Sequence, residues 1–195
     1  FYYSGHGVPD ELARSMYLLP KDGVAANIAS TGYKISDLYD ALAETAAESL
    51  VLLDACFSGF TKSGSALAST KGVVKLTSGA PRGNTVVLSA ASSNEVAHQY
   101  EEKSHGLFTY YLLKQLQETQ GNSTLGELFS YVEKQVVRTS LTVIRKSQTP
   151  SAAAGPAAGP AATTAAAALT PNFSSISLTS SARSITFMLA TASII

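Results

Sequence analysis

The sequence predicts an α/β sandwich with a mainly parallel sheet, and three observations carry this prediction. Apolar runs at residues 1–4, 49–53 and 85–90 predict strands, and the last two are continuous, as in parallel strands buried on both faces. Helical patterns at 36–49, 107–119 and from 124 to about 137 separate or follow these runs. Buried strands that alternate with helices favour parallel pairing, because a helical crossover returns the chain to the same side of the sheet.

The local sequence accounts for the elements of the first half. The strand at 1–4 ends at Gly5-His6-Gly7, where the chain must turn. The segment 17–20 is expected to be extended and to lead into a turn at Lys21-Asp22-Gly23. Ser36 and Asp37 can cap the helix that follows, and this helix should end near the strand at 49–53.

The second half is read in the same way. A Gly-, Ser- and Lys-rich loop is expected at 58–84, before the strand at 85–90. An amphipathic helix follows at 107–119. Thr124 and Glu127 then have the spacing of a capping box, which predicts the start of the last helix.

The composition limits the functions that the chain can have. The 14 acidic residues balance the 14 basic ones, so no net charge attracts the chain to nucleic acid or to an anionic membrane. The single cysteine excludes an internal disulfide and a Cys-rich zinc site. A chain without disulfides fits the reducing cytosol without requiring it. Because the sequence opens directly on a strand without Met, we expect the natural chain to begin earlier, and the localisation stays open.

A change of composition near Pro150 predicts a boundary between a domain at 1–150 and a tail at 151–195. Residues 151–171 are rich in Ala, Pro, Gly and Thr, which is typical of an extended linker that could join other domains. Residues 184–195 are apolar but too few to span a bilayer. They fit a late strand, a disordered tail or the start of a longer segment.

Two reactive residues stand at the ends of predicted strands. His6 follows the strand at 1–4, and Cys56 follows the strand at 49–53. Because ligands bind beyond the carboxyl ends of parallel strands, the two side chains can converge there. A histidine within hydrogen-bonding reach can activate a thiol for nucleophilic attack, and backbone N–H groups at glycine-containing turns can stabilise an oxyanion. The pattern therefore favours acyl-transfer chemistry.

Five further segments are notable for their order along the chain: SGHG (4–7), YLLPKD (17–22), LLDACFSG (52–59), VVLSAASSNEVA (86–97) and HGLFTYYLL (105–113). This order resembles that of caspase- and metacaspase-type cysteine peptidases, particularly the bacterial caspase-like branch. In caspases the histidine precedes the cysteine by about 50 residues, as it does here. The resemblance implies a caspase-like three-layer sandwich with its N-terminal strand or strands missing, so that one edge of the sheet would be open.

The resemblance also implies roles for individual residues. His6 would be the general base, Cys56 the nucleophile, and the backbone N–H groups of Gly7 and Cys56 the oxyanion hole. Asp54 and Ser4 occupy the positions of an acid and a small hydroxyl residue in a metacaspase-like specificity pocket, which implies cleavage of polypeptides after Arg or Lys. No metal or other cofactor is expected.

Other interpretations remain beside these. The chain could be a non-catalytic caspase-like module that binds or regulates a partner, although it keeps both His6 and Cys56. A serine hydrolase is disfavoured because the sequence holds no G-x-S-x-G elbow. Asp54 could instead cap backbone groups at the strand end, and Ser4 could simply allow close packing. His98 and His105 are expected at the surface or at a helix start.

Overall fold

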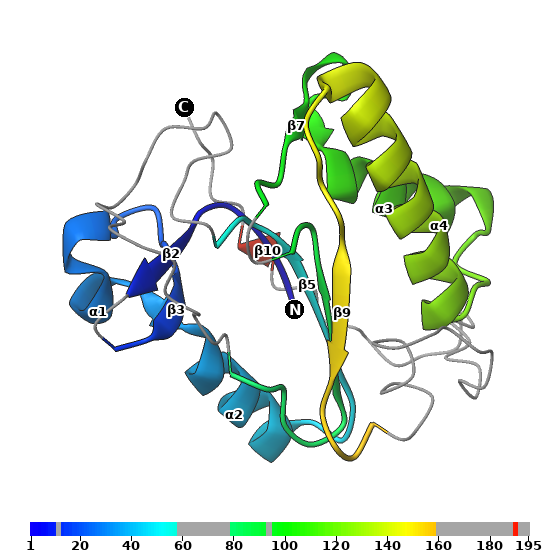
Figure 1. Cartoon of the computed structure of the whole chain (residues 1–195). Coiled ribbons are helices and arrows are strands. Elements are labelled where there is room, and N and C mark those ends of the chain that lie inside the picture. The colour runs from blue at the N-terminus through cyan, green and yellow to red at the C-terminus, as the bar shows by residue number, and fades with distance from the viewer. Residues whose placement is uncertain (11–12, 58–78, 93–94, 159–188, 191–195) are drawn as a thin grey trace.

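The computed structural model describes residues 1–10, 13–57, 79–92, 95–158 and 189–190. Its main sheet has the strand order β10-β1-β5-β6-β9 (Figure 1). Every neighbouring pair is parallel except β6 and β9, so the predicted mainly parallel sheet is confirmed. The strands are β1 (Tyr2–Ser4), β5 (Ser49–Asp54), β6 (Thr85–Ser89), β9 (Ser151–Ala154) and β10 (Leu189–Ala190).

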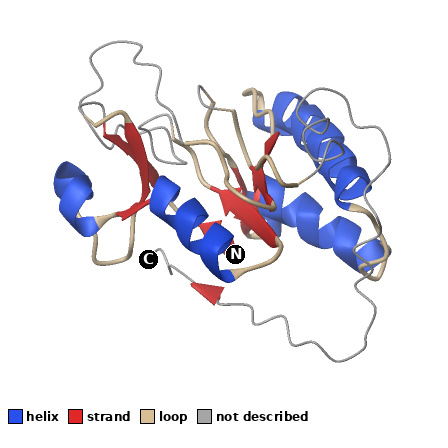
Figure 2. Ribbon diagram, turned by 90° about the horizontal axis from the view of Figure 1, so that it is seen from below, coloured by secondary structure: helices blue, strands red, loops and turns tan. Residues whose placement is uncertain are grey.

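Helices cover both faces of this sheet and give the predicted three layers. Helix α2 (Ile35–Thr45) lies on one face, and α3 (Leu107–Glu118) and α4 (Leu125–Thr139) lie on the other (Figure 1 and Figure 2). The alternation of side chains along β6 explains both layers. Leu88 joins the core under α3 and α4, whereas Val87 joins the core under α2.

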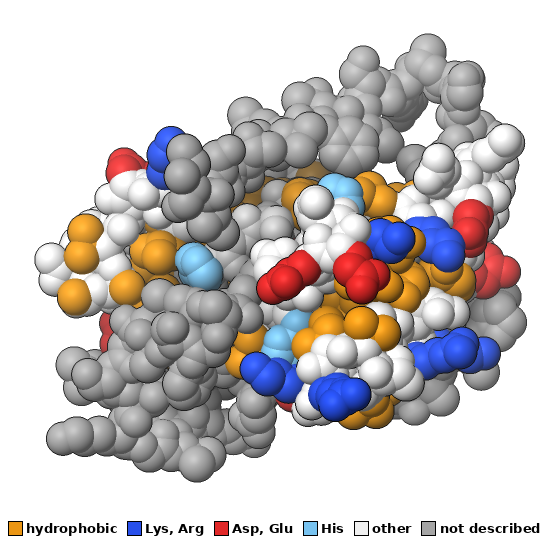
Figure 3. All heavy atoms as spheres, turned by 90° about the horizontal axis from the view of Figure 1, so that it is seen from above, with side chains coloured by type: hydrophobic (Ala, Val, Ile, Leu, Met, Phe, Trp, Pro, Cys, Tyr) orange, Lys and Arg blue, Asp and Glu red, His pale blue; other side chains and the backbone are white. Residues whose placement is uncertain are grey.

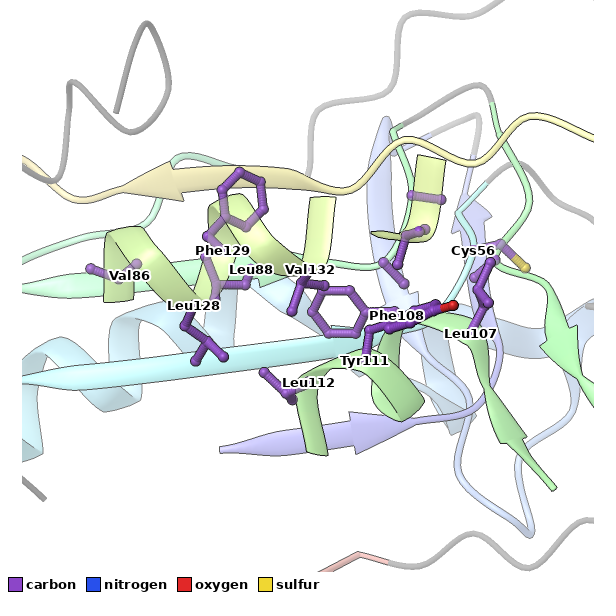
Figure 4. Packing of buried hydrophobic residues seen from close by; sticks show 14 residues of the cluster. Cys56, Val86, Leu88, Leu107, Phe108, Tyr111, Leu112, Leu128, Phe129 and Val132 are labelled. Carbon is purple, nitrogen blue, oxygen red and sulfur yellow. The ribbon is translucent and has the colours of Figure 1, made fainter. Parts of the chain in front are cut away.

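The largest of the three hydrophobic clusters among the described residues lies between the sheet and helices α3 and α4 (Figure 4). Leu107, Phe108 and Val132 are among its fully buried side chains. Cys56 lies at one end of this cluster, on the side of Leu107. The nucleophile expected from the sequence is therefore built into the main core.

A second, antiparallel sheet extends the chain beyond β1. It consists of β2 (Gly7–Asp10), β3 (Ser15–Leu18) and β4 (Tyr33–Lys34), with a 3-10 turn at Ala25–Asn27 and the short helix α1 (Ile28–Thr31) beside it. The sequence predicts the extended segment near 17 but not β2, because GVPD has turn-forming residues at three of its four positions. The remaining short elements of the described residues are β7 (Gln99–Tyr100), a 3-10 turn (Glu101–Lys103), β8 (His105–Gly106) and a π-helical turn (Ser140–Ile144).

The helix boundaries match the sequence to different degrees. Thr124 and Glu127 form the expected capping box of α4, with each side chain bonded to the backbone N–H of the other residue. The expected caps of α2 are wrong, since its N-cap is Lys34 and no side chain bonds to the cap. Helix α2 also ends at Thr45, because Ala46 is already extended.

The first four residues of the predicted linker lie in a strand. Residues Ser151–Ala154 form β9, which pairs antiparallel with β6 from Ser89↔Ser151 to Val86↔Ala154. The small side chains of Ala152 and Ala154 pack against the core under α3 and α4. The open edge of β6 supplies backbone partners that the composition of the segment does not reveal. Residues 159–171 of the predicted linker and most of 184–195 lie outside the described residues.

The outer edge of β1, expected to be open, pairs with β10 instead. Tyr2 and Tyr3 lie in parallel register with Leu189 and Ala190. Among the described residues, no helix is long and apolar enough to cross a membrane. The predicted loop at 58–84 lies outside the described residues up to residue 78.

Candidate active site

The carboxyl ends of β1 and β5 lie side by side. Ser4 and Asp54 are register partners in these parallel strands, and the backbone N–H of Gly5 donates a hydrogen bond of 3.2 Å to the carbonyl of Asp54. His6 and Cys56 each lie two residues beyond this pair. The strand register therefore brings the two reactive residues to the same edge of the sheet, as the sequence predicts.

His6 lies in the short connection between β1 and β2, and its backbone is fixed by two donors. The N–H of Leu19 and the hydroxyl of Tyr3 each lie 2.9 Å from the carbonyl oxygen of His6. The Tyr3 hydroxyl is shared with the carbonyl of Leu19, also at 2.9 Å. Burial raises the pKa of Tyr3 to about 12, so the phenol remains a donor at neutral pH.

Gly7 places the His6 segment directly against the Cys56 segment. A Cβ atom on Gly7 would lie 2.8 Å from the carbonyl oxygen of Cys56 and would overlap the ring of Phe57. Only glycine allows this close approach of the two backbones. The structure thus brings together the segments of three predicted site residues: His6, Gly7 and Cys56.

The backbone N–H of Gly7 is directed away from β3. Gly7 and Leu18 are register partners, yet the bond beside them runs from the N–H of Leu19 to the carbonyl of His6. This pattern marks Gly7 and Leu18 as a non-hydrogen-bonded pair, in which neither residue's N–H points at the partner strand. The Gly7 N–H therefore lies outside the β2–β3 ladder.

Cys56 is almost completely buried, with 1% of its surface exposed. It shares its core cluster with Ala90, Ala91 and Ala97, which lie beyond the carboxyl end of β6, and with Leu107 at the start of α3. A reagent or substrate can reach the thiol only if some of the surrounding chain moves. The chain's one cysteine is thus enclosed in this structure.

Asp54 is fully buried and is bonded to the N-terminus of α3. Its Oδ2 atom accepts hydrogen bonds from the hydroxyl of Thr109 at 2.5 Å and from the backbone N–H of Thr109 at 3.3 Å. A carboxylate at a helix N-terminus is stabilised by the unsatisfied N–H groups of the first turn. The hydroxyl of Tyr2 lies 2.8 Å from that of Thr109 and extends the chain of bonds.

Gly106 completes the surroundings of this carboxylate. A Cβ atom at Gly106 would overlap the side chain of Asp54, so the glycine leaves the carboxylate the space it occupies. Ser4 is half-buried opposite Asp54. Thr109 is the residue that Asp54 caps, and no local sequence pattern connects the two residues.

The two remaining histidines differ in their surroundings. His105 is exposed, as predicted, but His98 is buried, with 7% of its surface exposed, and the prediction for it is wrong. Burial, with the nearby charge of Lys146, lowers the pKa of His98, although a bond to the Ser147 backbone and the charge of Glu95 oppose this. The backbone N–H of His98 donates to Gln148, 50 positions away, and no local pattern reveals this contact.

Figure 3 shows one face of the molecule, on which acidic, basic and hydrophobic side chains all occur. Within the described part of the chain, no group of three or more His, Cys, Asp or Glu side chains could hold a metal ion.

Comparison with protein families places these features in a known group. Residues 1–158 match the Peptidase_C14 family, described as the caspase domain. The matched region runs from the start of β1 through β9 and includes every candidate site residue. No curated protein matches the chain.

Proposed function

The chain belongs to the caspase domain family, a family of cysteine peptidases, and from this we propose that it is an endopeptidase with Cys56 as nucleophile and His6 as general base. One observation carries the proposal. The register of β1 and β5 and the packing of Gly7 on Cys56 bring both residues to one edge of the sheet.

The proposed reaction uses these groups in two stages. The thiolate of Cys56 attacks the peptide carbonyl carbon, forming a C–S bond, and the negative charge develops on the carbonyl oxygen. The N–H groups of Gly7 and Cys56 would stabilise this oxyanion, and the direction of the Gly7 N–H away from β3 supports that role. His6 gives a proton to the leaving amine as the C–N bond breaks. Water then hydrolyses the thioester and restores the thiol.

We further propose that the substrate residue before the cleaved bond is Arg or Lys. The support is the fully buried carboxylate of Asp54, two residues before the nucleophile and opposite Ser4. A cationic side chain that reached this carboxylate would form a charge-assisted bond in a low-dielectric site. The bonds from Thr109 hold the carboxylate in one orientation for such a contact.

The Ala- and Pro-rich residues after the matched region complete the proposal. We propose that they join the peptidase to other domains, and that the partner of the active site itself is a polypeptide. The burial of Cys56 supports the alternative function, a non-catalytic module, since a permanently buried thiol cannot react. Peptide cleavage distinguishes these two functions.

The test is cleavage of fluorogenic peptides that end in Arg, Lys, Asp or Leu, in reducing buffer with and without calcium. We expect cleavage after Arg and Lys, its loss in Cys56→Ala and His6→Ala, and full activity in the control His105→Ala, which alters an exposed histidine. Circular dichroism checks that each variant is folded. Cleavage after Asp alone would reject the role of Asp54, and no cleavage by the folded chain would support the non-catalytic module.

A further inference from the structure

One buried amide connects the two ends of the segment that follows β6. The name β6 loop is used here for the described residues between β6 and β7, which are 90–92 and 95–98. The Nε2 atom of Gln148 donates to the carbonyl of Ala90 at 2.9 Å, and its Oε1 atom accepts from the N–H of His98 at 2.8 Å. Gln148 is 1% exposed, so water does not compete for either bond.

The residue after Gln148 holds the loop at a further point. The carboxylate of Glu95 accepts bonds from the backbone N–H of Thr149 at 2.6 Å and from the Thr149 hydroxyl at 3.2 Å. The hydroxyl of Ser92 donates to the same carboxylate at 2.8 Å. Residues 148 and 149 thus bind the β6 loop at its start, near its middle and at its end.

The backbone of Gln148 is held by a residue outside the loop. The backbone N–H of Gln148 donates to the hydroxyl of Ser140 at 3.2 Å, directly after α4. Only a side chain with both a donor and an acceptor can satisfy a carbonyl and an N–H at once, which explains an amide at this position. Loss of the side chain would leave two buried backbone groups unsatisfied.

The loop held in this way belongs to the buried cluster that contains Cys56. The N–H of Ala90 donates to the carbonyl of Leu53 on β5 at 2.8 Å, and the carbonyl of His98 accepts from the N–H of Leu107 on α3 at 2.9 Å. Both ends of the loop therefore lie at the edge of the sheet where β5 leads to Cys56. Ala90, Ala91 and Ala97 belong to the same buried cluster as the cysteine.

We propose that Gln148, assisted by Glu95, is a positioning residue that keeps the β6 loop closed beside Cys56 and so controls access to the thiol. The proposal rests on the proposed function only in treating Cys56 as the reacting group. Opening of the β6 loop breaks the hydrogen bonds that Gln148 and Glu95 make, and closure of the loop forms them again. The segment at 148–149, between the π-helical turn and β9, thereby regulates the site.

The rate of alkylation of Cys56 measures this opening without any peptidase activity. The chain contains one cysteine, so the mass of the intact full-length protein after treatment with iodoacetamide reports this site alone. At one fixed pH we expect Gln148→Ala to react at least 10-fold faster than the wild type. Gln148→Glu keeps the acceptor for His98 but loses the donor to Ala90, and should fall between the two.

A matched control separates loop opening from a general loss of stability. Tyr111→Phe also removes one buried hydrogen bond, of 2.7 Å to Thr139 between α3 and α4, but leaves the β6 loop bonds intact. We expect it to lower the melting temperature while changing the alkylation rate less than threefold. Equal rates for Gln148→Ala and Tyr111→Phe at equal stability would overturn the proposal.

Further outcomes keep the test decisive. If Gln148→Ala does not fold, Glu95→Gln decides, because Glu95 is only half-buried and its replacement should raise the rate about threefold. An unchanged rate in Glu95→Gln would then reject the proposal. A wild-type thiol that reacts as fast as a cysteine in an unfolded peptide would also reject it, whatever the peptidase activity. Absent cleavage with the expected alkylation rates would reject only the proposed function.

In active enzyme, Gln148→Ala should make the thiol more accessible to the alkylating reagent while it weakens the binding of substrate. A looser β6 loop exposes the thiol but disturbs the site to which a substrate binds, so Gln148→Ala should raise KM while it accelerates alkylation. A role limited to overall stability would not raise KM at a temperature at which both proteins are folded.

Discussion

At the scale of single residues, the site depends on groups whose importance is not visible in the sequence. His6 and Cys56 are candidates from the sequence because each follows an apolar strand, and His6 also lies between two glycines. Tyr3 could be recognised only as a core aromatic residue, yet its hydroxyl binds the backbone of His6. Periodicity indicates which face a side chain occupies but not where a hydroxyl at its tip is directed.

Replacement of Tyr3 by Phe should destabilise the protein while keeping the core filled. The variant loses the donor to the carbonyls of His6 and Leu19, and we expect a decrease of about 1–2 kcal/mol in the free energy of unfolding. Urea denaturation with an unchanged m-value measures it. Tyr33→Phe, at a 47% exposed tyrosine, is the control and should stay within about 0.5 kcal/mol. Equal effects in both variants would contradict the role of Tyr3.

At the scale of elements, the contact between β5 and α3 gives Asp54 a structural role at the start of the helix. The sequence predicts the start of α3 at residue 107 correctly, and it also predicts that Asp54 follows the strand before the cysteine. It does not show that the two elements meet at Thr109, 55 positions later. The carboxylate can cap the helix and still attract a substrate cation, so its structural part must be measured separately.

A double-mutant cycle isolates this structural part. We expect Asp54→Asn and Thr109→Val to be coupled by about 1–3 kcal/mol in the free energy of unfolding, because both change the bond from the Thr109 hydroxyl to Asp54: Thr109→Val removes the donor, and Asp54→Asn replaces the charged acceptor by a neutral amide. Asp54→Asn combined with Thr124→Ala, at the separate cap of α4, should be additive within about 0.5 kcal/mol. Absent coupling to Thr109 would show that Asp54 does not support the helix.

The strand β9 shows why some elements escape prediction. The segment SAAA has little intrinsic preference for a strand, since alanine is depleted in sheets. Its conformation comes from the backbone groups that β6 presents along its edge. The same holds for the β6 loop, whose partners lie 50 or more residues later. Local patterns cannot reveal structure that only a distant partner imposes.

At the scale of the whole molecule, the fold class followed from the apolar runs because both faces of the sheet are covered. Val51 and Leu53 pack under α2, whereas Leu50 and Leu52 pack under the other helices. A strand in this setting cannot alternate between polar and apolar residues, which explains the continuous run. The stability of this core then depends on pH through a few groups at its border.

Acidification should weaken the protein in two stages. Burial raises the pKa of Glu95, but bonds from Ser92, Ser147 and Thr149 outweigh it and hold the pKa below the ordinary 4.5. Burial holds the pKa of His98 below 6.5, with Lys146 adding to the effect. Both groups bind protons more readily when unfolded, so stability should fall below pH 6.5 through His98 and further below pH 4.5 through Glu95.

Urea midpoints at several pH values check this prediction. Glu127 has a lowered pKa because of its bonds to the backbone and side chain of Thr124, and it also contributes at the acidic end. Glu95→Gln therefore serves as the control, since it should reduce the loss of stability below pH 4.5 without changing the part above it. A stability that stays constant between pH 7 and pH 5 would contradict the contribution of His98.

The late position of β9 also has a consequence for synthesis on the ribosome. Strand β6 is complete at Ser89, but its outer neighbour begins only at Ser151, about 60 residues later. At about 5–20 residues per second, the nascent chain carries this bare edge for roughly 3–12 s. An unpaired strand edge can recruit another chain, so the cell must protect the growing polypeptide during this interval. Faster elongation across residues 90–150 would shorten the exposure, and slow codons there would prolong it.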